Sequence, residues 1–278
     1  MEQTSIYLVA IAEAGALGDM RAGGLEDGQT ARVLAADGFD ALAVDVPRDM
    51  FEGDGAEARL KDVRWLAPRA AAHERLVRTA MDRAAVMPVG FGSVFSDERA
   101  LAASLARHEH DIAAFLAEAA GAREWSIKAL ADRDAFRQRA REALAATSDV
   151  EGGAAYLQRR KQEEDIERLA EELALEALDE LIDGADGTFR DVVERPVNVQ
   201  PEDGRWLAAH LAFLVGEEER LAFDDAIERG GRALDAAGID LEVSGPWPPY
   251  SFCPRVGEDA GDLTSAEADV VQLEREAV

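Results

Sequence analysis

The sequence is poor in cysteine, lysine and aromatic residues. Its 278 residues include one cysteine, Cys253, and three lysines, Lys61, Lys128 and Lys161. A single cysteine excludes an intrachain disulfide and is typical of a reducing compartment. Only 6% of the residues are aromatic, so any place where aromatic side chains gather is conspicuous.

Long apolar runs are also missing. No stretch approaches the roughly 20 apolar residues that a membrane-spanning helix needs. The first 15 residues contain a short apolar run, but it lacks the basic flank and the small-residue cleavage site of a secretory signal. The sequence therefore predicts a cytoplasmic protein without a membrane segment.

Positive charge is scarce. The chain has 30 basic and 57 acidic residues, which gives a formal net charge of −27. A field of this sign repels nucleic-acid phosphates and anionic lipid surfaces. Nucleic-acid and membrane partners are therefore disfavoured, whereas solubility is favoured.

Residues 239–252, IDLEVSGPWPPYSF, combine a strand with a cluster of aromatic and proline residues. Apolar and polar residues alternate from Ile239 to Ser244, which predicts a strand with one buried face. The three prolines that follow remove backbone donors and favour an extended path. We call residues 245–252 the strap.

The candidate partner-interface residues of the strap are Trp247, Pro248, Pro249, Tyr250 and Phe252. Their three aromatic side chains supply a large apolar area on a backbone that loses little entropy when ordered. Such side chains either bind a partner protein or fold back to cap the core of their own domain. The sequence leaves both uses open, and they do not exclude each other.

The first part of the chain predicts an α+β domain over residues 1–121. Strands are expected at residues 5–12, 32–36, 40–46 and 86–95. Asp37-Gly38 is a hairpin signal between the second and third of these strands. Helical periodicity covers residues 58–85, where Pro68 favours a break into two helices. Asp97 then predicts the start of a further helix, which Gly121 ends.

The rest of the chain predicts a second domain over residues 122–253, followed by an acidic tail over 254–278. A long charged helical region covers residues 134–182, with an interruption near 148–153. It either packs on a sheet or forms a short coiled coil, and the first is favoured because fewer than three heptads are clean. The element order, β-α-β-β-α-β, is that of the ferredoxin-like, split βαβ arrangement.

No motif predicts a reaction centre. His108 and His110 diverge by about 200° on a helix, so they do not readily share one metal ion. His210 lies in an apolar strand and is predicted to be a satisfied core residue. Residues 90–93, GFGS, lack a dinucleotide fingerprint or P-loop, and their glycines are predicted to permit a bend in a strand or a close backbone approach. Cys253 has no activating neighbour in the sequence. We therefore expect no enzyme activity, no metal and no cofactor.

Five stretches carry a resemblance to a known family. They are Ile6–Val9 (IYLV), Met87–Phe95 (MPVGFGSVF), Gly153–Leu157 (GAAYL), Ala208–Val215 (AAHLAFLV) and the strap, GPWPPYSF. Together and in this order, they resemble the gas vesicle protein F/L family, the accessory proteins of gas vesicle formation. Gly90 is a departure, since the family often has arginine at that position, and no role of that arginine is carried over.

The resemblance implies a non-enzymatic accessory protein of gas vesicle assembly, with a ferredoxin-like C-terminal domain. It implies binding to the hydrophobic shell protein A and to other accessory proteins during nucleation or shell formation, and a location at the gas vesicle. A second hypothesis is a tandem α+β small-molecule-binding or sensor module, which rests on fold analogy. A ligand that raises the melting temperature would favour that alternative.

Overall fold

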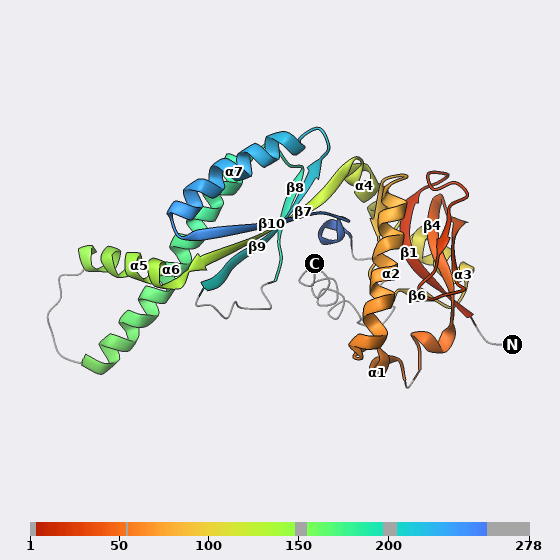
Figure 1. The fold of residues 1–278 in the computed structure, drawn as a ribbon, viewed down its shortest axis with the longest axis horizontal. Helices are drawn as coiled ribbons and strands as arrows, with labels where there is room; N and C mark the ends of the chain where they lie inside the picture. The colour runs from red at the N-terminus through yellow and green to blue at the C-terminus, as the bar shows by residue number, and fades with distance from the viewer. Residues whose placement is uncertain (1–3, 54, 148–154, 197–204, 255–278) are drawn as a thin grey trace. The chain divides into compact units, whose positions relative to one another are not determined.

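The computed structural model describes residues 4–53, 55–147, 155–196 and 205–254 (Figure 1). These residues form two compact units, of which the second is Arg123–Trp247. The first unit contains the residues up to Ala122 and those from Pro248 onward. Both units combine helices with a sheet, which confirms the predicted α+β class. The division differs from the predicted domain end at residue 253, because the later part of the strap packs with the first unit.

The first unit is built on one sheet. Its strands are β1 (Thr4–Glu13), β2 (Arg21–Gly23), β3 (Thr30–Ala36), β4 (Phe39–Pro47), β5 (Val86–Pro88) and β6 (Val94–Phe95), and its helices are η1 (Arg48–Met50), α1 (Ala56–Leu60), α2 (Val63–Met81), α3 (Glu98–Arg107), α4 (Glu109–Ala119) and η2 (Tyr250–Phe252). The sheet order is β2-β3-β4-β1-β5, and β6 also pairs with β1.

Strand β1 is covered on both faces, which explains its unbroken apolar sequence. Tyr7 and Val9 belong to the core that α2 closes. Ile6 and Leu8 belong to a second core, which α3 and α4 close. The first unit is therefore a sheet between two helical layers.

Strands β3 and β4 form the predicted hairpin. Asp37 and Gly38 have φ angles of 46° and 86°, and Ala36 lies opposite Phe39. A two-residue loop with positive φ at both positions matches the twist of the flanking strands, and Asp-Gly is a preferred sequence for it. The hairpin prediction is confirmed.

The predicted break at Pro68 is wrong. Helix α2 runs through Pro68 and begins after Asp62, whose side chain accepts a hydrogen bond of 3.0 Å from the Arg64 amide. Proline removes one backbone donor from a helix. Pro68 and Arg64 are both exposed, so water can bind the carbonyl that loses its partner.

Two other predicted elements are divided in the structure. The predicted strand 86–95 forms β5 and β6, separated by a turn in which Gly92 has φ 95°. The predicted helix after Asp97 forms α3 and α4, which meet at His108. Asp97 caps α3 as predicted, because its side chain accepts a hydrogen bond of 2.8 Å from the Ala100 amide. Histidine and aspartate are weak helix formers, which accounts for the break at residues 108–111.

The second unit is a four-stranded sheet with helices packed on it. Its elements are β7 (Ala122–Asp132), α5 (Arg133–Thr147), α6 (Ala155–Gly184), β8 (Asp191–Glu194), β9 (Arg205–Gly216), α7 (Arg220–Ala236) and β10 (Ile239–Trp247). The sheet order is β10-β7-β9-β8. The predicted order β-α-β-β-α-β is confirmed, with two helices, α5 and α6, in the first helical position.

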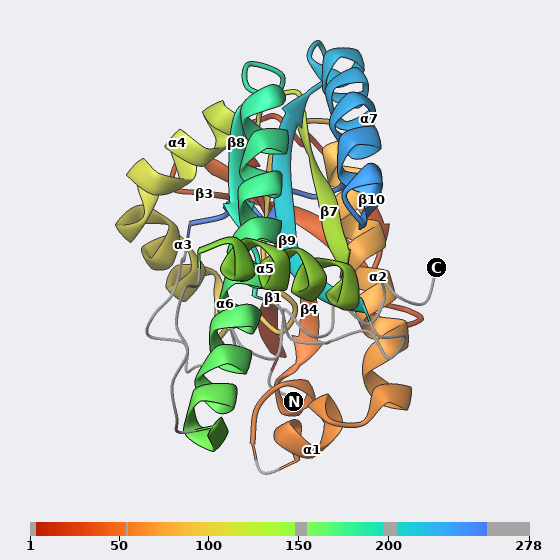
Figure 2. The same cartoon turned by 90° about the vertical axis from the view of Figure 1, so that its left-hand side faces the viewer.

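Helices α6 and α7 lie side by side across the sheet (Figure 2). Ile166 and Leu178 of α6 share one core with Phe213 of β9 and Phe223 of α7. The charged helix therefore packs on the sheet, as favoured from the sequence. The predicted interruption at residues 148–153 lies outside the described residues, as does the predicted tail beyond Pro254. None of the helices in the described ranges has both the length and the apolar character that crossing a bilayer requires.

Candidate interaction site

The strap leaves β10 at a point where it closely approaches β7. The Gly245–Pro246 peptide is cis, and Gly245 has φ 143°. A Cβ atom added to Gly245 would lie 2.9 Å from the Glu124 carbonyl oxygen and 2.9 Å from Cε3 of Trp125. Both the backbone angle and the lack of space require glycine here.

We expect Gly245→Ala to lower the free energy of unfolding of the second unit by about 2 kcal/mol, because the new methyl group strains the backbone and clashes with β7. Urea titration measures this loss. Gly184→Ala in α6 is the matched control, since no heavy atom lies within 4 Å of its added Cβ. Equal losses in the two variants would contradict the proposed steric cause.

Trp247 belongs to the second unit and is half-buried. It lies opposite Glu124 of β7, and its indole Nε1 donates a hydrogen bond of 3.2 Å to the Ser244 hydroxyl. Pro246, just before it, is exposed. Part of the Trp247 ring therefore remains at the surface of this unit.

Tyr250 lies in the first unit instead. Its ring packs against the core that contains Tyr7, and its hydroxyl donates a hydrogen bond of 3.4 Å to Glu74 Oε2 of α2. Burial raises the pKa of Tyr250 well above its ordinary value, and the Glu74 carboxylate adds to this effect. The side chain is thus held as a neutral phenol against α2.

Phe252 and Cys253 pack against the other core of the first unit. The Cys253 thiol donates a weak hydrogen bond of 3.4 Å to the Pro88 carbonyl of β5. Pro248 and Pro249 are buried. The end of the strap therefore contacts the cores on both faces of the sheet, and Cys253, which follows it, reaches the edge strand β5.

A histidine–tyrosine pair lies in the core against which Tyr250 packs. The Tyr7 hydroxyl is 2.8 Å from His73 Nδ1, and the Gly92 amide donates to the same hydroxyl oxygen at 3.4 Å. One hydrogen is shared between the Tyr7 hydroxyl and His73 Nδ1, and the tautomer of His73 decides which of the two donates it. Burial lowers the pKa of His73 to about 4, against a small opposing effect of the Val89 backbone, so this imidazole is neutral near pH 7.

No sequence pattern singled out this pair. His73 lies seven positions after Leu66 and four before Val77, and all three are buried on α2. The helical period is therefore the signal that could have placed His73 in a core. Its partner on β1 is 66 residues away, which no local pattern reveals.

The structure also places the other residues that were considered as candidates for a catalytic or metal site. His210 is buried and lies 2.8 Å from the Ser126 hydroxyl through Nε2, which confirms that it is a satisfied core residue. Residues 90–93 form a bend in which the Ser93 hydroxyl donates to the Gly90 carbonyl at 2.9 Å. His110 is exposed on α4. Within the described ranges, no three His, Cys, Asp or Glu side chains are grouped so that they could hold a metal ion.

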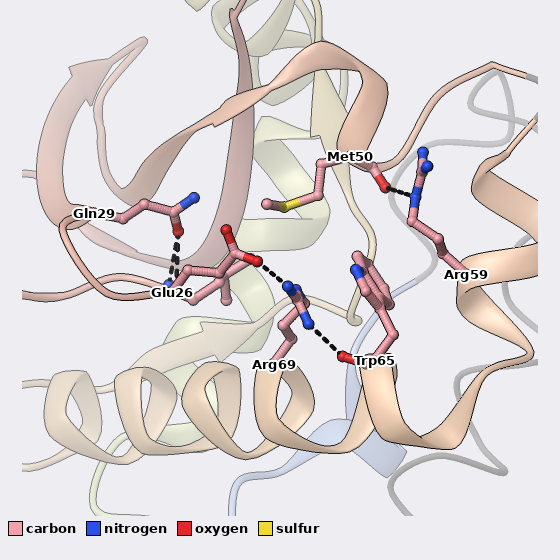
Figure 3. A network of polar contacts seen from close by, with 7 residues as sticks. Glu26, Gln29, Met50, Arg59, Trp65 and Arg69 are labelled. Atoms are coloured by element: carbon pink, nitrogen blue, oxygen red, sulfur yellow. Dashed lines mark hydrogen bonds and ion pairs between the residues drawn. The ribbon is translucent and has the colours of Figure 1, made fainter.

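A polar network fixes the loop between β2 and β3 to α2 (Figure 3). Arg69 pairs with Glu26, donates a hydrogen bond of 2.6 Å to the Trp65 carbonyl, and lies 4.3 Å from the centroid of the Trp65 ring. The Gln29 carbonyl oxygen accepts hydrogen bonds of 3.1 Å from the amides of Leu25 and Glu26. These contacts fix the loop against α2, so we assign the network a structural role.

The fold defines a class of α+β proteins built from two units. In this chain the buried histidines and the Arg69 network stabilise the fold. Over residues 5–254 the sequence matches the family described as "Gas vesicle synthesis protein GvpL/GvpF". This match covers most of the chain, and the protein belongs to that family. The resemblance seen in the sequence is confirmed.

Individual relatives agree with this assignment. The chain is 26% identical to gas vesicle protein L of Streptomyces sp. (strain CB03234) over 245 residues, which is 86% of this chain and 89% of that protein. It is 25% identical to gas vesicle protein L1 of Halobacterium salinarum over 240 residues, covering 81% and 82% of the two chains. The crystal structure of GvpF from Anabaena sp. PCC7120 has the same fold, with a TM-score of 0.72 and 18% identity, over 91% of this chain and 99% of that one.

Proposed function

We propose that this chain is a non-enzymatic accessory protein of gas vesicle assembly that acts in the cytoplasm and at the gas vesicle. It binds the hydrophobic shell protein A and other gas vesicle accessory proteins during nucleation or shell formation. Membership of the GvpL/GvpF family over residues 5–254 carries the proposal. The structural use of His73, His210 and residues 90–93 is in keeping with a role other than catalysis.

The physical reason for such a protein is the solubility of the shell subunit. A subunit that faces gas on one side exposes apolar surface before assembly, and such surface aggregates in water. A chain with a net charge of −27 stays soluble while it covers that surface.

The strap residues contribute unequally to this proposal. Tyr250 and Phe252 pack on the cores of the first unit, and Pro248 and Pro249 are buried. Trp247 keeps part of its ring at the surface beside the exposed Pro246. Tryptophan is enriched among the residues that dominate binding energy at interfaces, so Trp247 is the first residue to test as an anchor for the shell subunit.

Purified protein is expected to keep the shell subunit in the supernatant after centrifugation, and Trp247→Ala is expected to do so several-fold less well. The matched control is Leu221→Ala, because Leu221 is an apolar residue of the same unit with 79% exposure. Far-ultraviolet circular dichroism checks that both variants fold. A Trp247→Ala variant that folds and solubilises the subunit as well as the control would remove this residue from the interface. A wild-type protein that leaves the subunit in the pellet would contradict the proposed function.

A further inference from the structure

Helix α2 carries positive charge on a protein that is otherwise strongly acidic. Four arginines and one glutamate lie within Val63–Met81. Arg69 is used internally, since it pairs with Glu26 (Figure 3). Arg64 and Arg75 are exposed, and among the described residues neither of them forms an ion pair.

The exposed residues between these two arginines are small. Arg75 follows Arg64 by eleven positions, which is three helical turns, so the two side chains lie on one side of α2 about 16 Å apart. Ala67 and Pro68 lie between them and are exposed. Small side chains allow another helix to approach closely. We call Arg64, Ala67, Pro68 and Arg75 the basic face.

The C-terminal half of helix α6 carries charge of the opposite sign. Residues 169–184 contain six carboxylates and no basic residue. Glu172 and Asp183 are exposed and are again eleven positions apart. Leu175 lies between them and is 46% exposed, although it is a large apolar residue. Glu172 makes an ion pair of 2.7 Å with Arg168, but both side chains are more than half exposed, so this pair is easily exchanged. We call Glu172, Leu175 and Asp183 the acidic face.

The two faces match in spacing as well as in charge. If two such helices lie parallel, the register that places Arg64 against Glu172 also places Arg75 against Asp183. The same register places Leu175 against Ala67, where the small side chain leaves room for it. Opposite charges at matched positions set the register and orientation of a contact between proteins.

We propose that the basic face on α2 of one molecule binds the acidic face on α6 of a second copy of this chain. Each chain carries both faces, and both are exposed. Like faces repel, so each contact joins the basic face of one copy to the acidic face of another. Such contacts build either a symmetric pair with two reciprocal contacts, or rings and filaments. This inference concerns self-association and does not rest on the proposed function.

The net charge of −27 opposes the approach of two copies, so the ionic strength of the test must be chosen with care. At about 0.15 M salt the Debye length is about 8 Å. Repulsion between distant charges is then screened, whereas ion pairs in contact still attract. At about 1 M salt the Debye length falls to about 3 Å, and the contact is expected to weaken.

The test is sedimentation velocity of the full chain over a range of protein concentrations at about 0.15 M salt. Two charge-reversal variants are compared with the wild type. The first reverses the basic face (Arg64→Glu with Arg75→Glu), and the second reverses the acidic face (Glu172→Arg with Asp183→Arg). A control, Arg141→Glu with Arg229→Glu, makes the same change in net charge as the first variant at exposed positions of α5 and α7.

The wild type and the control are expected to form larger species as concentration rises, and each reversed variant alone is expected to remain monomeric. An equimolar mixture of the two reversed variants is expected to associate again, since each then offers the surface that the other lacks. A wild type that remains monomeric overturns the proposal. So does a mixture that fails to associate, or a control that loses association as completely as the first variant.

Discussion

Replacing Tyr250 with alanine is expected to lower the free energy of unfolding of the first unit by about 3 kcal/mol. Removing a large aromatic side chain from a core costs about 3–5 kcal/mol, and the lower end applies because Tyr250 is half-buried. The loss comes from its packing against the core and its hydrogen bond to Glu74. Hydrogen exchange of peptides from α2 and β5 measures the stability of this unit.

Tyr250→Phe separates packing from hydrogen bonding. It keeps the ring and removes the hydroxyl, so we expect a loss of about 1 kcal/mol. Peptides from α7 and β9 report on the second unit in the same experiment. If Tyr250→Ala left exchange in α2 unchanged, the strap would not be part of the core of the first unit.

The second large effect is the loss of stability of the first unit in acid. The ordinary pKa of His73 is 6.5, and burial lowers its pKa to about 4 in the folded protein. The unfolded chain therefore binds a proton at His73 before the folded chain does. This difference is absent above about pH 6.5, grows as the pH falls, and reaches about 3 kcal/mol near pH 4 and below.

His73→Gln isolates this contribution from the titration of the carboxylates. The glutamine amide can either donate to the Tyr7 hydroxyl or accept from it, but it does not titrate in this range. The difference in unfolding free energy between wild type and variant is expected to shift by about 3 kcal/mol in favour of the variant between pH 7 and pH 4. A difference that stays constant over this range would show that His73 is not buried as a neutral base.

The sequence predicted the elements whose signals are local. Alternation marked β10, Asp37-Gly38 marked a hairpin, and Asp97 marked the start of a helix. Each signal acts within a few residues of the structure that it specifies. The break expected at Pro68 failed because a proline on the exposed side of a helix loses one hydrogen bond that water can replace, while Asp62 provides a stronger start signal.

The candidate site was only partly predictable. The residues of the strap were recognisable because aromatics and prolines gather there in a chain with few aromatics. Their contacts in the folded protein were not predictable from the sequence. Tyr250 is hydrogen-bonded to Glu74, 176 residues away, and Cys253 is hydrogen-bonded to Pro88, 165 residues away. Partner binding and core capping use the same side chains. For Tyr250 and Phe252 the structure shows contact with the cores of the first unit, and binding by Trp247 remains a prediction.

The position of the strap in the chain also affects how the protein is made. The ribosome releases the strands and helices of the first unit early, but Tyr250 and Phe252 emerge only after the whole of residues 123–247. At about 5–20 residues per second, this interval lasts roughly ten seconds. Throughout it, the nascent first unit lacks the Tyr250 and Phe252 side chains that pack against its two cores in the finished protein.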